Sequence, residues 1–205
     1  YTATSSPEAI TGTVTQSGSG NITVTGLTNS TAYTFTVTAT NAIGTSLASA
    51  VSNSVVIPQP QLGDFYGGGV VFHLFVVGEE THGLIAAVAD QSSGIQWYND
   101  SYVTTGATGT TIGAGSTNTD AIIAAQGATE TSYAAGVARA YTGGGFTDWF
   151  LPSKDELNQM YTNKATINTT ASANGGSDFF GIYWSSTEIV VNFAWFQDFN
   201  DGGQG

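Results

Sequence analysis

Few side chains in this sequence could bind a metal ion. The two histidines are His73, inside an apolar run, and His82, in a polar one, and there is no cysteine. Two histidines without a thiolate fall short of a tetrahedral zinc site, so we interpret both as structural or exposed residues. We expect no metal site. Calcium at 198–202 or at 97–100 is the minor alternative, because neither segment has the full ligand spacing of a calcium loop.

Three carboxylates are candidates for acid–base chemistry. Asp148, Asp155 and Glu156 could supply a pair of the kind that cleaves glycosidic bonds. The local pattern favours another role, because Glu156 follows Ser153 by three residues, as in a capping box, and Asp155 suits a helix N-terminus. The sequence has no Gly-x-Ser-x-Gly motif, and no histidine follows His82 to serve a serine nucleophile. We therefore expect a protein that is not an enzyme and has no cofactor.

The charge balance excludes several partners. Lys plus Arg number 3 against 15 Asp plus Glu, which gives a formal net charge of -12 over 205 residues. Three cations cannot neutralise a phosphate backbone or an anionic membrane surface, so we expect no nucleic-acid partner. No apolar run approaches the ~20 residues of a transmembrane helix, so we expect no membrane insertion. Hydrophobic residues make up 40%, enough to form a core.

Residues 1–57 form one compositional block, in which Glu8 is the only charged residue. Alternating polar and β-branched or aromatic residues predict strands near 1–5, 9–16, 21–26, 32–41 and 48–57. The run at 26–41 resembles a fibronectin type III domain, in which a corner tyrosine hydroxyl, here that of Tyr33, ties back to nearby backbone. The predicted class is an all-β, partial fibronectin type III-like sandwich that acts as a spacer.

Residues 58–61, Pro-Gln-Pro-Gln, predict a linker. Residues 62–205 hold all four Trp, both His, all three cations and 14 of the 15 acids. We predict strands at 69–77 and 83–89 with a hairpin loop at 78–82, and helices at about 117–126 and 131–141. A third helix begins at Lys154 after the N-cap Ser153 and ends near Asn163, and strands return from Ile182. The mixture predicts an α+β domain.

This second block resembles the C-terminal domain family of bacterial collagen-like adhesins, which has relatives in Bacteroidetes and their phages. The segments that carry the resemblance are Gly63–Phe72, His82–Ala87, Gly94–Trp97, Asp148–Leu157 and Tyr183–Glu188. The resemblance implies a C-type-lectin-like fold with a loop-rich ligand face, and binding in place of catalysis. Members of the family usually continue past the position of Gly205 with a further strand, so we expect a longer protein.

The stretch after Glu188 resembles the variable region of proteins that a diversity-generating retroelement diversifies. The residues that match the fixed letters of such regions are Ala194, Trp195, Gln197, Phe199, Gly202 and Gln204. We call the other ten the variable positions: Ile189, Val190, Val191, Asn192, Phe193, Phe196, Asp198, Asn200, Asp201 and Gly203. An Asn codon changed at its adenines cannot encode Lys, Glu, Gln, Met or Trp, and none of these occupies a variable position.

The resemblance implies that the variable positions form a ligand-binding face. We expect their side chains to share one exposed surface, because a patch of large apolar residues with a polar rim is typical of a partner site. The scaffold of that face is expected to be Trp184, Ala194, Trp195 and Phe199. Residues 180–182 could belong to the same face. The alternative is that residues 189–193 form a buried strand, because their composition is that of a strand.

The function we expect is that of a surface-displayed binding module, either an adhesin or a phage receptor-binding protein. It would be extracellular, on a phage tail or fibre or on a bacterial cell. Its partner would be a cell-surface protein or a glycan receptor, and the relatives imply a homotrimer. Two alternatives stay open: a bacterial surface lectin with a fixed polysaccharide ligand, and a structural decoration domain of a virion or fibre.

Overall fold

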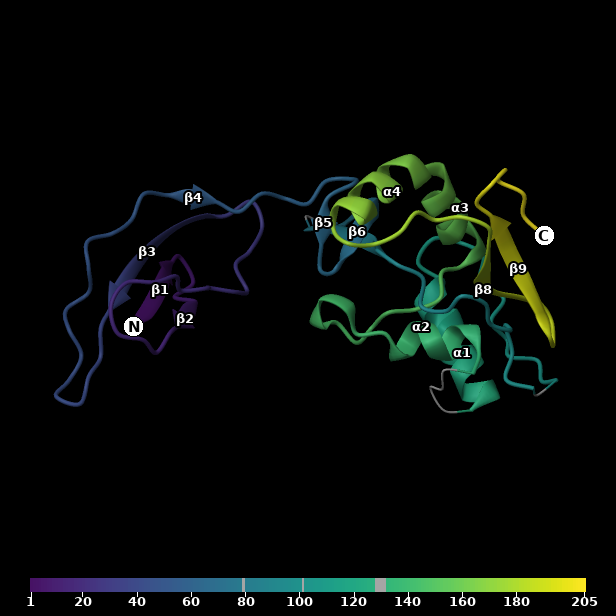
Figure 1. Cartoon of the computed structure of the whole chain (residues 1–205), viewed down its shortest axis with the longest axis horizontal. Coiled ribbons are helices and arrows are strands. Elements are labelled where there is room, and N and C mark those ends of the chain that lie inside the picture. The colour runs from purple at the N-terminus through teal and green to yellow at the C-terminus, as the bar shows by residue number, and fades with distance from the viewer. Residues whose placement is uncertain (79, 101, 128–131) are drawn as a thin grey trace. The chain divides into compact units, whose positions relative to one another are not determined.

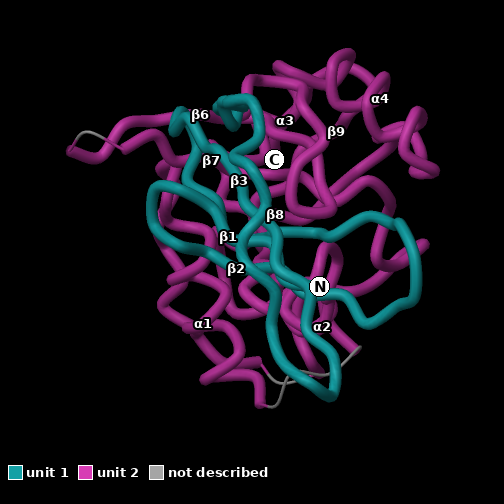
Figure 2. Tube along the Cα trace, turned by 90° about the vertical axis from the view of Figure 1, so that its left-hand side faces the viewer, with its two compact units in different colours: residues 1–59 teal, residues 60–205 magenta. Residues whose placement is uncertain are grey.

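The computed structural model describes residues 1–78, 80–100, 102–127 and 132–205. The chain divides into two compact units, Tyr1–Gln59 and Pro60–Gly205, which Figure 2 distinguishes by colour. The division falls inside the segment predicted as a linker. Across the described ranges, no helix combines the length and the apolar character that crossing a membrane requires.

The first unit is made of β-strands (Figure 1). Its strands are β1 (Thr2–Ser6), β2 (Thr11–Thr13), β3 (Ala32–Thr38) and β4 (Val55–Val56), joined in one antiparallel sheet in the order β2-β1-β3-β4. The buried Tyr33 accepts a hydrogen bond from the backbone N–H of Thr28 at 3.0 Å and donates one to the Glu8 carboxylate. The predicted corner tie-back is therefore present. The unit is all-β, but its described strands form one sheet and not the two of a sandwich.

The strand predicted at 21–26 is wrong. This segment has no regular secondary structure, although its polar and apolar residues alternate. The backbone carbonyl of Thr23 lies so close to Gly12 of β2 that a Cβ at Gly12 would overlap it. The segment therefore packs on β2 face to face. In that position it cannot join the edge of the sheet, where a strand would find its hydrogen-bond partners.

The long strand predicted at 48–57 is reduced to β4, and a serine repeat explains the loss. The N–H groups of Ser46, Ser49 and Ser52 donate to the carbonyls of Ala39, Val37 and Phe35 at 2.8–2.9 Å. Each serine hydroxyl accepts from the N–H of the same partner at 3.0 Å. Three residues of this segment therefore match two of the neighbouring strand, which is incompatible with the one-to-one register of a β-ladder.

The second unit opens with a three-stranded antiparallel sheet in the order β5-β6-β7, made of β5 (Phe65–Tyr66), β6 (Gly69–Val77) and β7 (Glu80–Ala87). The bounds predicted for β6 are confirmed. Strand β7 starts three residues earlier than predicted, because Glu80, Thr81 and His82 pair with Val77, Val76 and Phe75. Glu79, in the predicted hairpin loop, lies outside the described residues.

Helices and a hairpin follow: α1 (Gly115–Gln126), α2 (Ala134–Ala140), a 3₁₀ turn η1 (Gly143–Gly145), α3 (Lys154–Thr162), α4 (Lys164–Ala173), β8 (Ile182–Val190) and β9 (Phe193–Asp198). The helix predicted at 131–141 is shorter, and Thr131 lies outside the described residues. The start of α3 is confirmed, with Ser153 and Glu156 forming the predicted capping box. Helix α4 was not predicted. The α+β class of the second block is thus correct.

Two hydrophobic clusters form the core of the second unit, and the β8–β9 hairpin joins them. One cluster lies between β6, β7, α3 and α4 and includes Phe72, Leu157, Ile167 and Phe199. The other includes Trp97, Ile122, Tyr133 and Ala194. Ala194 in β9 and Phe199 just after it therefore contribute to different clusters, which fixes the hairpin at both ends.

Candidate ligand-binding site

The variable positions lie on the β8–β9 hairpin and on the loop that follows it (Figure 1). The two strands pair antiparallel, from Ile182 opposite Asp198 to Val190 opposite Phe193, with register shifts on both sides of Glu188. Val191 and Asn192 form the connecting turn. The positions therefore divide into two groups. The apolar positions at 189–193 lie at the closed end, and the polar positions from Asp198 onward lie at the open end.

Each of the ten variable positions, all within the described ranges, is exposed or half-buried. At the closed end, Val190 is 52% exposed, Ile189 44% and Phe193 39%. Val191, Phe196 and Asp198 are half-buried, and the exposed remainder are Asn192, Asn200, Asp201 and Gly203. The alternative of a buried strand at 189–193 is wrong, because the turn places this segment at the surface. That these residues bind a ligand stays a prediction.

Two of the four predicted scaffold residues are buried, and the other two, Trp184 and Trp195, are half-buried. Ala194 and Phe199 are fully buried, and so is the fixed Gln197. Trp195, which we expected to point inward, is half-buried. Its ring lies under the Lys154 ammonium, with Nζ 4.2 Å from the ring centroid. The indole of Trp195 is therefore covered by a lysine of α3 and not by core residues. Cation–π attraction and contact with the aliphatic part of the lysine side chain stabilise it in place of core packing.

An aromatic cluster occupies the centre of the face. Trp184 in β8 contacts Phe193 and Phe196 in β9 edge to face, with ring centroids 5.3 and 6.2 Å apart, and the two Phe rings are 6.3 Å apart. The Trp184 indole N–H donates to the Ile95 carbonyl at 2.9 Å, which fixes its orientation. Trp184 is half-buried and packs against the second core cluster. Trp184, the cross-strand partner of Phe196, therefore packs beside two variable phenylalanines and connects them to the core, as a scaffold residue should.

The acidic residues at the open end are engaged in turns. Asp198 Oδ1 accepts from the backbone N–H of Asn200, and Asp201 Oδ1 accepts from that of Gly203, both at 2.8 Å. These bonds shape the loop, and each uses one carboxylate oxygen. Among the described residues there is no group of three or more His, Asp or Glu side chains placed to hold a metal ion. The histidines His73 and His82 instead stack on the ring of Phe75, at 5.9 and 5.7 Å.

The carboxylates considered for acid–base chemistry are separated by their local roles. Glu156 is fully buried, and its two oxygens accept from the backbone N–H groups of Gly113 and Ser153, each at 2.7 Å. Asp155 is half-buried at the start of the same helix, and Asp148 is exposed in a loop. Glu156 therefore acts as the capping residue that the sequence predicted, and its oxygens are committed to backbone groups.

Sequence reasoning missed the part played by Glu188. Its carboxylate is only 8% exposed and accepts hydrogen bonds of 3.0–3.1 Å from the backbone N–H groups of Thr105 and Gly106 and from the Thr105 hydroxyl. Glu188 directly precedes the variable positions and so ties the hairpin to the loop at 102–106. One feature of the sequence could have predicted this role: Glu188 directly follows the run of apolar and small polar residues at 182–187. A glutamate at the end of such a run indicates a buried carboxylate with specific hydrogen-bond partners.

Exposed apolar residues also lie beside the predicted face. Phe180 is 77% exposed and Ile182 62%, next to the open end of the hairpin. Gly181 between them accepts a hydrogen bond from the Phe199 N–H at 2.7 Å. These residues were considered for the face, and the structure places them at its open end.

Comparison with known proteins identifies the family. The family of the Lcl C-terminal domain matches residues 86–205, which begin in β7 and include the helices and the β8–β9 hairpin. No curated protein and no solved structure matches the chain. The matched region contains most of the segments on which the resemblance rested, together with every variable position. The chain therefore belongs to the Lcl C-terminal domain family, the C-terminal domain family of collagen-like adhesins.

Proposed function

We propose that this chain is a non-enzymatic binding module, displayed on a bacterial or phage surface, that recognises its receptor through the β8–β9 hairpin. The observation that carries the proposal is the contrast along β9 and the loop after it. Variable positions there are all exposed or half-buried, whereas three of the six fixed positions, Ala194, Gln197 and Phe199, are buried. The association of the family with surface, adhesin-like proteins supports the same function.

The proposal includes diversification of this face by a retroelement. A position that receives random side chains cannot be part of a core, because a Phe→Ala change there costs ~3–5 kcal/mol of the ~5–15 kcal/mol that stabilise a domain. The turn at 191–192 and the exposed ends of both strands meet that condition, since side chains there project into solvent. Buried neighbours preserve the hairpin while the exposed residues change.

The fold proposed to accompany this function is a partial fibronectin type III-like spacer followed by a C-type-lectin-like domain. The tie-back of Tyr33 to Thr28 supports the first assignment. Helices packed on small antiparallel sheets, with long loops between them, support the second. The spacer would hold the binding domain away from the surface to which the protein is anchored.

The chemistry of the face favours a receptor surface that is apolar at its centre and neutral or basic at its edge. Exposed aliphatic and aromatic side chains occupy the closed end, and Asp198 and Asp201 occupy the open end. The three cations of the chain are engaged internally: Arg139 pairs with Asp120 at 2.7 Å, Lys154 covers Trp195, and Lys164 donates to the Phe199 carbonyl. An acidic receptor would therefore be repelled by the net charge of -12. Cell-surface proteins and glycans fit this description, and no cofactor is required.

Sequencing the gene across the population that carries it tests the proposal. We expect amino-acid differences between copies to concentrate at the ten variable positions, with adenine-directed codon changes, and to be rare at Ala194, Gln197 and Phe199. A reverse-transcriptase gene and a template repeat are expected beside the gene. Differences spread evenly over variable and fixed positions would contradict diversification by a retroelement. The remaining hypothesis would then be a binding face of constant sequence.

A further inference from the structure

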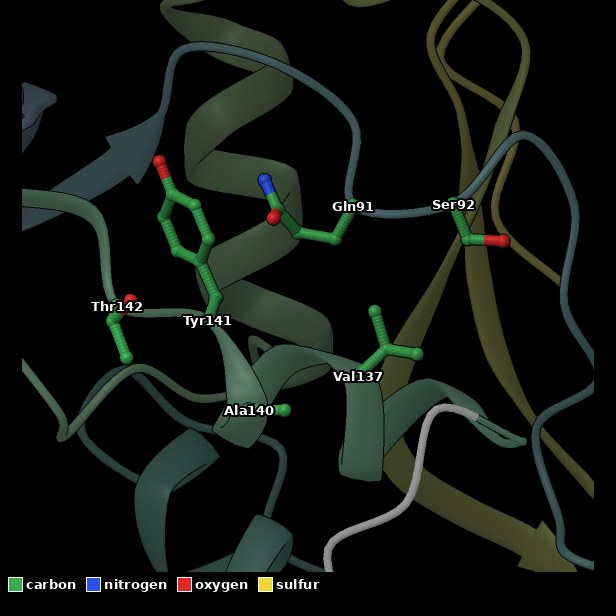
Figure 3. A pocket seen from close by; sticks show the side chains of 6 residues that line it. All are labelled: Gln91, Ser92, Val137, Ala140, Tyr141 and Thr142. Carbon is green, nitrogen blue, oxygen red and sulfur yellow. The ribbon is translucent and has the colours of Figure 1, made fainter.

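A pocket of about 300 Å³ lies between the C-terminal end of α2 and the loop after β7 (Figure 3). Its lining residues are Gln91, Ser92, Val137, Ala140, Tyr141 and Thr142. The volume is at the lower end of the roughly 300–1,000 Å³ range of small-molecule sites. A site of this size admits one small ring.

The lining is uncharged and mixes two kinds of group. The Gln91 amide, the Thr142 hydroxyl and the Tyr141 phenol provide donors and acceptors. The Ser92 hydroxyl points away from the other side chains in Figure 3 and bonds to the Gly94 backbone. The side chains of Val137 and Ala140 and the ring of Tyr141 provide apolar surface. A ligand that matches both kinds must be uncharged, must carry several hydroxyl groups, and must also present a face of C–H groups. We propose that this pocket binds one uncharged sugar ring.

The aromatic side of the pocket is held rigid by its neighbours. The Tyr141 ring lies edge-on to Trp149, with centroids 4.9 Å apart and planes at 65°. The Trp149 indole N–H donates to the Gly143 carbonyl at 3.0 Å. A Cβ on Gly143 would overlap the Tyr141 ring, so the close contact requires glycine there. A ring fixed in this way loses little conformational entropy when a ligand packs on it.

The polar side of the pocket is also fixed. Gln91 Nε2 donates to the Ala89 carbonyl at 2.6 Å, which orients the amide and directs it toward the Tyr141 side of the pocket, as Figure 3 shows. The preceding Asp90 accepts a hydrogen bond from the Tyr183 hydroxyl at 2.8 Å, which anchors the loop to β8. The amide oxygen of Gln91 can therefore accept a sugar hydroxyl at a defined position.

None of the six residues that line the sugar pocket is a variable position. Its six lining residues lie at 91–92 and 137–142, whereas the variable positions lie at 189–203. Its specificity would therefore stay constant while the hairpin changes. A glycosylated receptor could be held at both places, and weak binding at the pocket would then raise the overall affinity.

The test uses nuclear magnetic resonance on the full chain, with the methyl glycosides of glucose, galactose, mannose, fucose and N-acetylglucosamine as probes. We expect at least one to bind and to shift the backbone amide signals of residues 91–92 and 137–142, and the anionic sialic acid to bind more weakly. In Gln91→Ala and Tyr141→Leu, the affinity for that sugar is expected to fall about tenfold, about 1.4 kcal/mol. Gln91 is exposed, so its variant should remain folded.

Two controls make the result specific. Tyr102→Leu removes the same type of side chain at an exposed position outside the pocket and should leave sugar binding unchanged. Phe193→Ser alters the hairpin and should also leave it unchanged. The proposal is overturned if all five glycosides fail to bind, if the shifted signals belong to the hairpin, or if the Gln91 and Tyr141 variants bind like the wild type. Failure of all five glycosides to bind, or wild-type binding by the Gln91 and Tyr141 variants, leaves receptor binding by the hairpin untouched. Glycoside-induced shifts on the hairpin would overturn the pocket and support sugar recognition by the hairpin.

Discussion

Two phenylalanines of the hairpin region occupy opposite environments although only six positions separate them. Phe193 is 39% exposed at the tip, whereas Phe199 is fully buried and contacts Phe179, Tyr183 and Tyr161. The two residues are chemically identical, so a substitution at each isolates the effect of position. They therefore provide a direct comparison of variable and scaffold positions.

We expect Phe199→Ala to lower the free energy of unfolding by ~3–5 kcal/mol, because it leaves a cavity in the core. Phe193→Ala should cost about 1 kcal/mol, the value of its edge contacts with Trp184 and Phe196. Urea denaturation of the full chain followed by tryptophan fluorescence measures both. Equal losses at the two positions would contradict the division into face and scaffold.

The raised pKa of the Tyr183 hydroxyl predicts that the stability of the fold decreases at alkaline pH. Burial, and next the hydrogen bond to Asp90, raise the pKa of its hydroxyl above the ordinary value. The neutral form is thus favoured in the folded state, so this stabilisation is complete below the unfolded pKa of about 10 and is lost as the pH rises toward the folded pKa. We expect the Tm of Tyr183→Phe to fall less steeply above pH ~10 than that of the wild type.

Thermal unfolding between neutral and alkaline pH checks this expectation. Tyr66→Phe is the matched control, because Tyr66 is exposed. Its Tm should decline with pH in the same way as the wild type. A Tyr183→Phe profile parallel to the wild type would show that Tyr183 does not supply the pH dependence.

At the scale of single residues, local signals were predictive and distant contacts were not. The capping pair Ser153 and Glu156 lies three residues apart, so it could be predicted from neighbouring letters. The burial of Phe199 was implied by the resemblance, in which this residue matches a fixed letter. The half-buried position of Trp195 could not be predicted, because Lys154, whose side chain packs on its ring, is 41 residues away in sequence.

Among the elements, α3 depends most on a single side chain. Glu156 satisfies the N–H of Ser153 and that of Gly113 in the preceding loop. We expect Glu156→Ala to cost ~2–4 kcal/mol, since each buried N–H left without a partner costs ~1–3 kcal/mol. Asp155→Ala, one position earlier in the same turn, should cost only ~0.3–1 kcal/mol through the helix dipole.

Urea denaturation of the two variants gives the comparison. If Asp155→Ala proves as destabilising as Glu156→Ala, then charge at the helix N-terminus, and not the capping network, stabilises this region. Loss of any catalytic activity on Asp155→Ala would overturn the non-enzymatic assignment as well.

Elements whose sequence pattern agreed with their tertiary contacts could be predicted, and the others could not. The run at 69–77 became β6 with its predicted bounds. The alternating segment at 21–26 did not become a strand, because it packs over Gly12 of β2 and not along a sheet edge. Helix α4 contains three Thr, one Asn and one Ser among its ten residues, all weak helix formers, and it is stabilised by burying Ile167 and Ala171, which the sequence alone does not reveal.

At the scale of the whole molecule, we expect a homotrimer, because the resemblance to trimeric relatives implies one. Joining several weak sites in one assembly would also raise avidity without any new contact at each site. Sedimentation velocity of the full-length protein checks this, with a mass three times that of the chain as the expected result. A mass equal to that of one chain at all concentrations would exclude trimerisation as the source of avidity.

The whole-molecule organisation was only partly accessible from sequence. The change in composition near Pro58 and the charge imbalance could be seen directly, because both depend on counts of residues. The sugar pocket could not be predicted from the sequence. It is lined by a loop at 91–92 and by the end of a helix at 137–142, and these segments meet only because α2 packs against that loop. The aromatic cluster of Trp184, Phe193 and Phe196 likewise depends on the hairpin register.

The central claim, that the hairpin carries a substitutable recognition face on a fixed scaffold, is tested most directly by comparing two displayed libraries of the full chain. One randomises the ten variable positions, and the other randomises ten buried positions that include Ala194, Gln197 and Phe199. The fraction of clones that resist protease is measured in each. We predict that most clones of the first library resist and that few of the second do. Equal fractions in the two libraries would contradict the account.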